Sequence, residues 1–120
     1  MAIDSEDLPL PSPSRGRFSL RRRFGVLVVG GELDSIGAPW LAAALEPLLA
    51  IGGHLRISLR EVTFLGSPGL HVLADAAGAL TDRGRLVILN PSTAAERAIH
   101  AAGLRGSLDI VANPQLRVAR

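Results

Sequence analysis

Apolar residues recur along the chain with two different spacings, and the pattern predicts strands that alternate with helices. Short runs with a period of two, or with continuous apolar character, predict strands. The run that ends at Gly30 is nearly continuous, which is typical of a strand buried on both faces. Phe18 begins a shorter run that is expected to form an edge strand. Strands are expected at 18–22, 24–29, 55–59, 86–89 and 108–111, and residues 62–65 are expected to continue the third of these toward a turn.

Three helices are expected between these strands, because leucines and alanines there recur at helical spacing. Pro39 suits the first turn of the first helix, where a missing N–H costs nothing. Pro47 lies late in the same pattern and is expected to kink the helix or end it early. The second helix is expected to start near Pro68. Thr93 and Glu96 have capping-box spacing and predict the start of the third.

The resulting order β-β-α-β-α-β-α-β predicts an α/β fold. We expect a mostly parallel mixed sheet of about four to five strands with about three helices packed on it. The first hairpin should supply an antiparallel edge. The chain of 120 residues is long enough for one domain. We expect a disordered, Pro/Ser-rich N-terminal tail at residues 1–16, a domain at 17–113 and a frayed C-terminal tail at 114–120.

Composition and charge narrow the function classes. Apolar residues make up 48% of the chain, yet no run is long enough to cross a membrane, and the acidic N-terminus does not resemble a signal peptide. We therefore expect a cytoplasmic protein. The chain has no Cys, and its three His are scattered, so no metal and no cofactor are expected.

All basic residues are Arg, and four of them lie at Arg17 and Arg21–Arg23. Such a cluster can bind nucleic acid or an acidic partner. It can also be the solvated flank of a first strand. The near balance of charge elsewhere and the scarcity of aromatic residues favour the second interpretation, so no direct nucleic-acid contact is expected.

Motifs for catalysis are incomplete, so we do not expect an enzyme. The dinucleotide pattern G-x-G-x-x-G is absent, and a phosphate-binding loop would need a Lys that the chain lacks. Ser67 lies between a strand and a helix, as a hydrolase nucleophile does, but Leu65 occupies the first Gly position of G-x-S-x-G. His71 is spaced to face Ser67 on a helix, although no orienting acid accompanies the pair.

Ser67 and Asp34 each admit a structural and a functional interpretation. Ser67 followed by Pro68 is typical of an N-cap and a first helical turn. The same place also suits a phosphate, because a helix N-terminus carries free N–H groups and partial positive charge. Asp34 could stabilise the turn after its strand, or it could be an acidic contact on the same rim as Ser67.

Six segments together resemble the STAS domain of bacterial anti-sigma factor antagonists. They are Gly31-Glu32-Leu33-Asp34, Pro39 with the Leu-rich helix that follows, the strand at 55–59, the segment V-T-F-L-G-S-P-G-L at 62–70, the strand and turn at 84–91, and Ala-Gly-Leu at 102–104. The resemblance runs from about Phe18 to Val111. The G-E-L-D turn combined with the segment at 62–70 is its most specific part.

The resemblance implies partner switching. Such a protein binds an anti-sigma factor that is also a serine kinase of histidine-kinase-like ATPase fold, and binding frees a sigma factor. The kinase phosphorylates one Ser, here Ser67, the complex dissociates, and a serine phosphatase resets the protein. The residues expected to contact the partner are Asp34, Gly66, Ser67, Pro68, Gly69 and His71.

Two positions depart from the family pattern. The family usually has Asp before the phosphorylated Ser and Ser or Thr after it, where this chain has Gly66 and Pro68. Pro68 removes an N–H that could hold a phosphate. The alternative is therefore a STAS domain that does not switch, with Ser67 as a plain cap, acting as a scaffold or as an accessory subunit, for example of a lipid-transport system.

Overall fold

The computed structural model describes residues 8–11 and 18–112. Residues 1–7, 12–17 and 113–120 lie outside the described part of the chain, and with them most of the two expected tails. The described elements are β1 Leu8–Pro9, β2 Phe18–Arg23, β3 Val26–Leu33, α1 Gly37–Ile51, β4 Gly53–Leu65, α2 Ser67–Ala79, β5 Gly84–Leu89, α3 Thr93–Ala101 and β6 Asp109–Val111.

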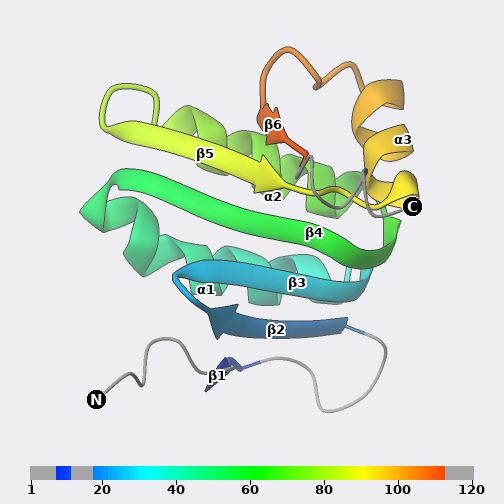
Figure 1. The fold of residues 1–120 in the computed structure, drawn as a ribbon, viewed down its shortest axis with the longest axis horizontal. Helices are drawn as coiled ribbons and strands as arrows, with labels where there is room; N and C mark the ends of the chain where they lie inside the picture. Colours follow the sequence, from blue (N-terminus) through cyan, green and yellow to red (C-terminus); the bar gives the residue numbers. More distant parts are fainter. Residues whose placement is uncertain (1–7, 12–17, 113–120) are drawn as a thin grey trace.

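One six-stranded sheet holds all of these strands, and their spatial order is their order in the sequence (Figure 1). β1 pairs with β2 and β2 with β3 in antiparallel fashion, while β3, β4, β5 and β6 run parallel. This confirms the predicted α/β fold, with a mixed sheet, an antiparallel first hairpin and three helices. β4 contains the strand predicted at 55–59 and its continuation at 62–65 in one long strand.

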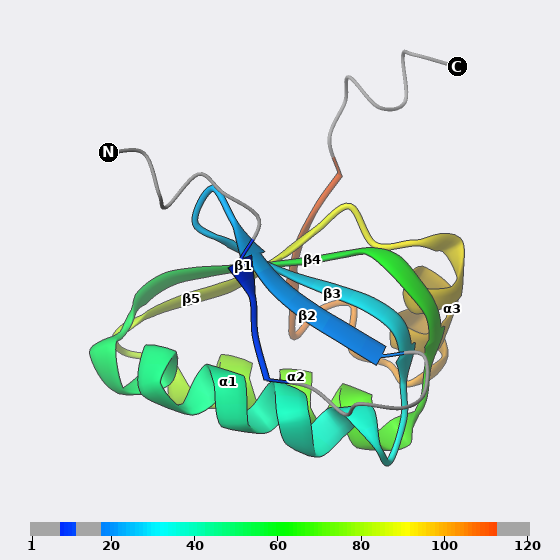
Figure 2. The same cartoon turned by 90° about the horizontal axis from the view of Figure 1, so that it is seen from below.

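Helices α1 and α2 cover one face of the sheet, and α3 packs at the end of the sheet where β4 finishes (Figure 2). The core lies between the sheet and these helices. It is built from aliphatic side chains, as the scarcity of aromatic residues requires. Its fully buried members include Leu33, Leu41, Leu45, Ile57, Leu59, Leu73, Leu80, Ile88 and Ile99.

β1 lies within the segment that was expected to be a disordered tail, so that expectation is wrong for residues 8–11. Leu8 pairs with Arg22, and the N–H of Leu10 donates to the carbonyl of Leu20 at 3.1 Å. Pro9 is tolerated because β1 is an edge strand, whose outer side needs no donor. The half-buried Leu10 packs against the core, and this contact stabilises the pairing of the short segment with β2.

The hairpin between β2 and β3 turns at Phe24 and Gly25, where a strand was expected to have begun already. Both residues have positive φ, 52° and 77°, as a two-residue type I′ turn requires. The Phe24 side chain is therefore 62% exposed instead of buried. The Arg23 guanidinium lies 5.5 Å from the centroid of its ring.

Helix α1 continues past Pro47 to Ile51, so the expectation of an early end is wrong. Pro47 removes one helical N–H and its ring crowds the carbonyl four residues earlier, but the last turn has other support. Gly52 donates its N–H to the carbonyl of Leu48 at 3.1 Å. The Arg83 guanidinium donates to the carbonyl of Leu49 at 2.9 Å, to that of Ala50 at 3.3 Å and, on α2, to that of Ala79 at 3.3 Å.

Helix α3 is capped by Ser92, one residue before the Thr93 that sequence spacing favoured. The Ser92 hydroxyl accepts from the N–H of Ala95 at 3.0 Å and donates to the carbonyl of Val62 at 2.6 Å. The bond to Val62 explains why Ser92 and not Thr93 caps the helix, because it also ties the Ser92 side chain to β4. Ser92 thereby fixes α3 to the sheet.

One ion pair crosses the open face of the sheet, from β2 to β4. Both terminal nitrogens of Arg21 donate to the carboxylate of Glu61, at 2.8 and 2.7 Å. The pair passes over Gly30 of β3, where an added Cβ would lie 3.3 Å from Glu61 Oε1. Part of the Arg cluster noted in the sequence thus has an intramolecular role, which agrees with the solvated-strand interpretation.

Stability should depend on pH through this pair. The hydrogen bonds from Arg21 lower the pKa of Glu61 below its ordinary value. The folded pKa is then lower than the unfolded one, so the stabilisation is present at neutral pH and is lost as pH falls through the folded pKa. Because both groups are partly exposed, we expect Glu61→Gln to cost only about 0.5 to 1 kcal/mol at neutral pH.

Urea denaturation of Glu61→Gln and of the unchanged protein, at neutral pH and again near pH 3, measures this difference. The two proteins should differ at neutral pH and converge in acid. A difference that stays constant with pH would show that the variant acts through packing and not through the charge of Glu61.

Candidate functional site

The loops that follow β3 and β4 meet at one end of the sheet. Leu33 and Leu65 are partners at the ends of these parallel strands, and the N–H of Gly66 donates to the carbonyl of Leu33 at 3.0 Å. Asp34 begins the loop after β3, and Ser67 is separated from the end of β4 by Gly66 alone. The structure therefore brings together the two segments that carry the sequence-predicted site residues.

Asp34 stabilises the turn into α1. Its carboxylate oxygen Oδ1 accepts from the N–H groups of Ile36 at 3.0 Å and Gly37 at 3.4 Å. Its carbonyl accepts from the N–H of Ala38 at 2.8 Å. These bonds support the structural interpretation of Asp34, and the side chain is only half-buried. Contact of Asp34 with a partner stays a prediction.

Ser67 is the first residue of α2 and not its N-cap, so the capping interpretation is wrong. The cap is Gly66, which has an extended backbone with φ −96° and ψ 177°. The carbonyl of Gly66 accepts the first helical hydrogen bond, from the N–H of Leu70 at 3.0 Å. Within the described part of the chain, the exposed Ser67 hydroxyl has no hydrogen-bond partner. That hydroxyl is therefore accessible to another protein.

Gly69 holds the start of α2 against the ends of β3 and β4. It is buried, and a Cβ added there would lie 2.6 Å from Leu33 Cγ and 2.8 Å from Leu65 Cδ1. The same Cβ would lie 2.9 Å from the backbone oxygen of Leu33, which cannot move without disturbing the strand. Gly69 thus positions the loop from beneath and offers no side chain to a partner.

Gly66 lies beneath the ring of Phe64. A Cβ at Gly66 would be 3.1 Å from Phe64 Cε2 and 3.5 Å from Cζ. The ring therefore occupies part of the space that a side chain at this position would need. This contact gives a physical reason for glycine at the first of the two positions that depart from the family pattern.

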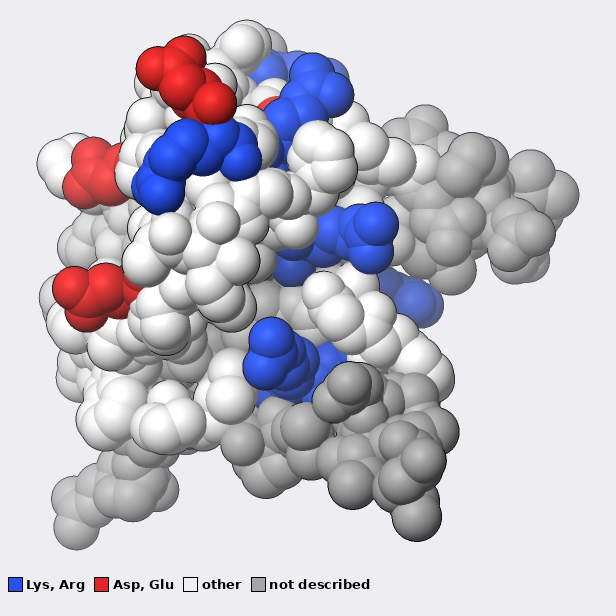
Figure 3. Space-filling view, turned by 90° about the vertical axis from the view of Figure 1, so that its left-hand side faces the viewer, with Lys and Arg blue, Asp and Glu red and all other residues white. Residues whose placement is uncertain are grey.

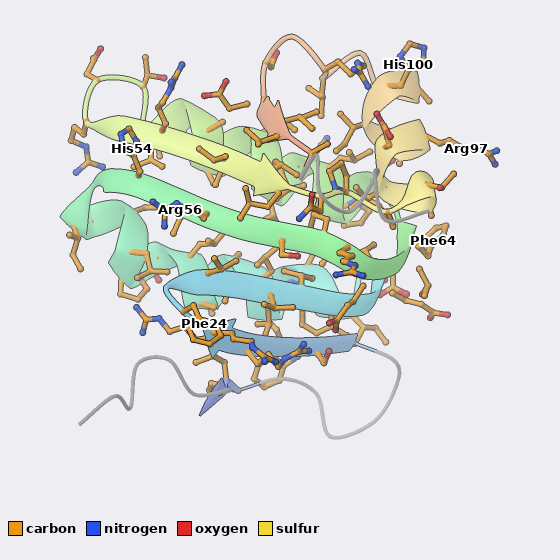
Figure 4. The ribbon with its side chains drawn as sticks, viewed as in Figure 1. Phe24, His54, Arg56, Phe64, Arg97 and His100 are labelled. Atoms are coloured by element: carbon orange, nitrogen blue, oxygen red, sulfur yellow. The ribbon has the colours of Figure 1, made fainter. Side chains whose placement is uncertain are left out.

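Sequence reasoning missed two exposed apolar side chains in these segments. Ile36 is 62% exposed in the turn after β3, and Phe64 is 52% exposed near the end of β4. Figure 4 shows Phe64 at the end of the sheet where β4 finishes, far from Phe24 at the hairpin. Two features of the sequence could have indicated this exposure. Ile36 stands in an otherwise polar turn, and Phe64 directly precedes a Leu that is expected to be buried.

Exposed side chains from both segments therefore lie at the same end of the sheet, and we call this group the switch surface. Its members are Ile36, Phe64, Ser67, Pro68 and His71. It combines apolar contact area with a hydroxyl and an imidazole, a composition that suits a protein interface. The segment from Phe64 to His71 contains no carboxylate that would repel a phosphate.

The described residues do not support a catalytic or metal site here. No hydrogen bond joins Ser67 to His71 in residues 8–11 and 18–112, and Asp34 is engaged by the turn. No cluster of His, Asp and Glu that could hold a metal ion occurs among the described residues. No helix in the described part is long and apolar enough to cross a membrane.

Comparison with known proteins gives consistent results. Residues 17–112 match the family described as Mlab, STAS domain. The anti-sigma-B factor antagonist of Bacillus subtilis is 33% identical over 88 residues, which cover 72% of this chain and 81% of that protein. The anti-sigma-F factor antagonist RsfB of Mycobacterium tuberculosis is 35% identical over 80 residues, or 66% of each chain.

Solved structures show the same fold. The crystal structure of an anti-sigma factor antagonist from Mycobacterium paratuberculosis superposes with a TM-score of 0.66 at 32% identity, covering 84% of this chain and 89% of that one. The anti-sigma factor antagonist SpoIIAA in its unphosphorylated form gives a TM-score of 0.63 over 85% of this chain and 96% of that one. At 20% identity, the second likeness concerns the fold alone.

Proposed function

The chain belongs to the STAS domain family, and on this basis we propose that it is an anti-sigma factor antagonist of the bacterial cytoplasm. It binds an anti-sigma factor through the switch surface and thereby frees a sigma factor. The anti-sigma factor is a serine kinase of histidine-kinase-like ATPase fold. Phosphorylation of Ser67 ends the complex, and a serine phosphatase restores it.

The exposed Ser67 hydroxyl carries this proposal. Because Gly66 supplies the cap, Ser67 can lose its free hydroxyl without costing α2 a capping hydrogen bond. A phosphate adds a charge of about −1.5 to −2 in the middle of the switch surface. Ile36 and Phe64 would bury apolar area against the partner, and an uncompensated charge beside them loses hydration on binding.

Intact-mass spectrometry tests the switch directly. The full chain is incubated with ATP and each serine kinase encoded in the same genome, beside the variant Ser67→Ala. We expect one kinase to add a single phosphate to the unchanged protein and none to the variant. Equal phosphate gain in both proteins would place the modification elsewhere and contradict the role of Ser67.

A second function is favoured by Pro68, which leaves the first turn of α2 with one N–H fewer to hold a phosphate. In that case the chain is a non-switching STAS domain, acting as a scaffold or as an accessory subunit. The same experiment separates the two functions when it is combined with a pull-down. A kinase that binds without transferring phosphate indicates a non-switching antagonist, and no bound kinase indicates a scaffold or an accessory subunit.

A further inference from the structure

A pocket of about 460 Å³ opens between α1 and the edge of the sheet, and its lining runs along α1 from Trp40 to Ile51, toward the end of the sheet opposite the switch surface. Ligand pockets in proteins generally enclose about 300 to 1,000 Å³ and are mostly apolar. The apolar lining here includes Leu27, Trp40, Ala43, Leu48, Ile51 and Leu55. Part of it is open to solvent, since Trp40 is 38% and Ile51 is 80% exposed.

Arg22 supplies the positive charge of this pocket. Side chains alternate along β2, so Arg22 lies on the same face as the buried Phe18 and Leu20, toward α1. His54 also lines the pocket. The described residues include no carboxylate paired with the exposed Arg22.

Arginines also gather on this end of the molecule. Figure 3 looks at this end and shows Arg side chains spread from the hairpin side towards β5, while Asp and Glu lie mainly at the helical side and the upper edge. The charges of the described residues at this end are therefore mainly positive, which favours an anion close to Arg22. The pocket combines an apolar interior with one cation at its rim, and that combination selects the chemistry of the occupant.

We infer that the pocket binds a single-chain acyl carboxylate. The hydrocarbon chain lies along the apolar wall of α1, and the carboxylate accepts hydrogen bonds from the guanidinium of Arg22, the geometry that arginine prefers. The guanidinium at the rim matches one carboxylate, and the apolar wall is recessed in a pocket, whereas a membrane surface takes up a protruding apolar face. The pocket is concave, and it is distinct from the switch surface.

Trp40 makes the binding measurable, because it is the only Trp of the chain and it lines the pocket. The intact protein is titrated with hexanoate, octanoate, decanoate and dodecanoate, each below its micelle concentration, and Trp emission is followed. Each added methylene should tighten binding roughly fourfold until the pocket is full. Decanol serves as the neutral probe and should bind at least roughly tenfold more weakly than decanoate.

Two variants test the named contacts. Arg22→Gln should weaken decanoate roughly tenfold and leave decanol unchanged, because only the carboxylate loses a partner. Ala43→Leu fills the pocket and should weaken both probes by the same factor or more. Ala42→Leu is the matched control, since Ala42 is exposed on the same helix but does not line the pocket. This variant should bind decanoate and decanol with unchanged affinity.

Three results would overturn the inference. Decanoate and decanol could bind alike, with Arg22→Gln affecting neither. The Trp signal could appear only above the micelle concentration or on phosphatidylglycerol vesicles, which would assign this face to a membrane surface. Finally, Ala43→Leu and Ala42→Leu could behave alike, which would place the ligand outside the pocket. Thermal denaturation of each variant confirms that the protein under test is folded.

Discussion

Gly69→Ala is expected to lower the free energy of unfolding by about 2 to 3 kcal/mol, a large loss for a single methyl group. The new Cβ would lie 2.6 Å from Leu33 Cγ and 2.9 Å from the backbone oxygen of Leu33. A side chain can shift, but the strand backbone cannot do so without opening its pairing. The start of α2 must therefore move away from β3, and urea denaturation measures the cost.

Gly78→Ala in the same helix is the matched control. Nothing lies within 4 Å of a Cβ at Gly78, so alanine there removes only the conformational freedom of glycine. We expect it to raise the free energy of unfolding by about 0.5 to 1 kcal/mol. If both substitutions shifted stability in the same direction, helix propensity would dominate, and the tight packing of Gly69 would be contradicted.

Ser67→Glu is expected to weaken binding to the cognate anti-sigma factor at least roughly thirtyfold while leaving the melting temperature nearly unchanged. Placing an unpaired charge in an interface costs about 2 to 5 kcal/mol, and each 1.4 kcal/mol is a factor of ten. Stability is spared because the Ser67 hydroxyl caps nothing and a negative charge is favourable at a helix N-terminus. Calorimetric titration measures the affinity.

Ser107→Glu controls for the added charge. Ser107 is exposed in the turn before β6 and does not belong to the switch surface. Its substitution should leave the affinity unchanged. Equal weakening by both variants would point to long-range repulsion by net charge, and an unfolded Ser67→Glu would show that the residue has a structural role after all.

The sequence predicted the order of elements because the periods of the apolar residues are clear in the parallel part of the sheet. It could not predict β1, since Leu8 and Pro9 lie in a polar, Pro-rich stretch and gain their place only from the edge of β2. The continuation of α1 beyond Pro47 depends on Arg83, 36 residues later in the chain and invisible to a local pattern.

The site was predicted as a set of segments, and its details depend on tertiary contacts. The proximity of Asp34 and Ser67 follows from both lying at the carboxyl ends of neighbouring parallel strands. The Ser-Pro pair suggested a cap at Ser67, but the chain continues from β4 into α2 through Gly66, so the cap falls one residue earlier. The exposure of Phe64 likewise depends on the irregular register between β3 and β4, which no period reveals.

Arg83 has a further consequence for how the two main helices move. Its guanidinium donates to the carbonyls of Leu49, Ala50 and Ala79, so the last turns of α1 and α2 share one set of donors. Fraying of either helix end releases a support of the other, which makes the two ends a single cooperative unit. The opposite end of α2, with Ser67, is held in a different way, by the close packing of Gly69 against Leu33 and Leu65, so both ends of this helix are fixed to the rest of the domain.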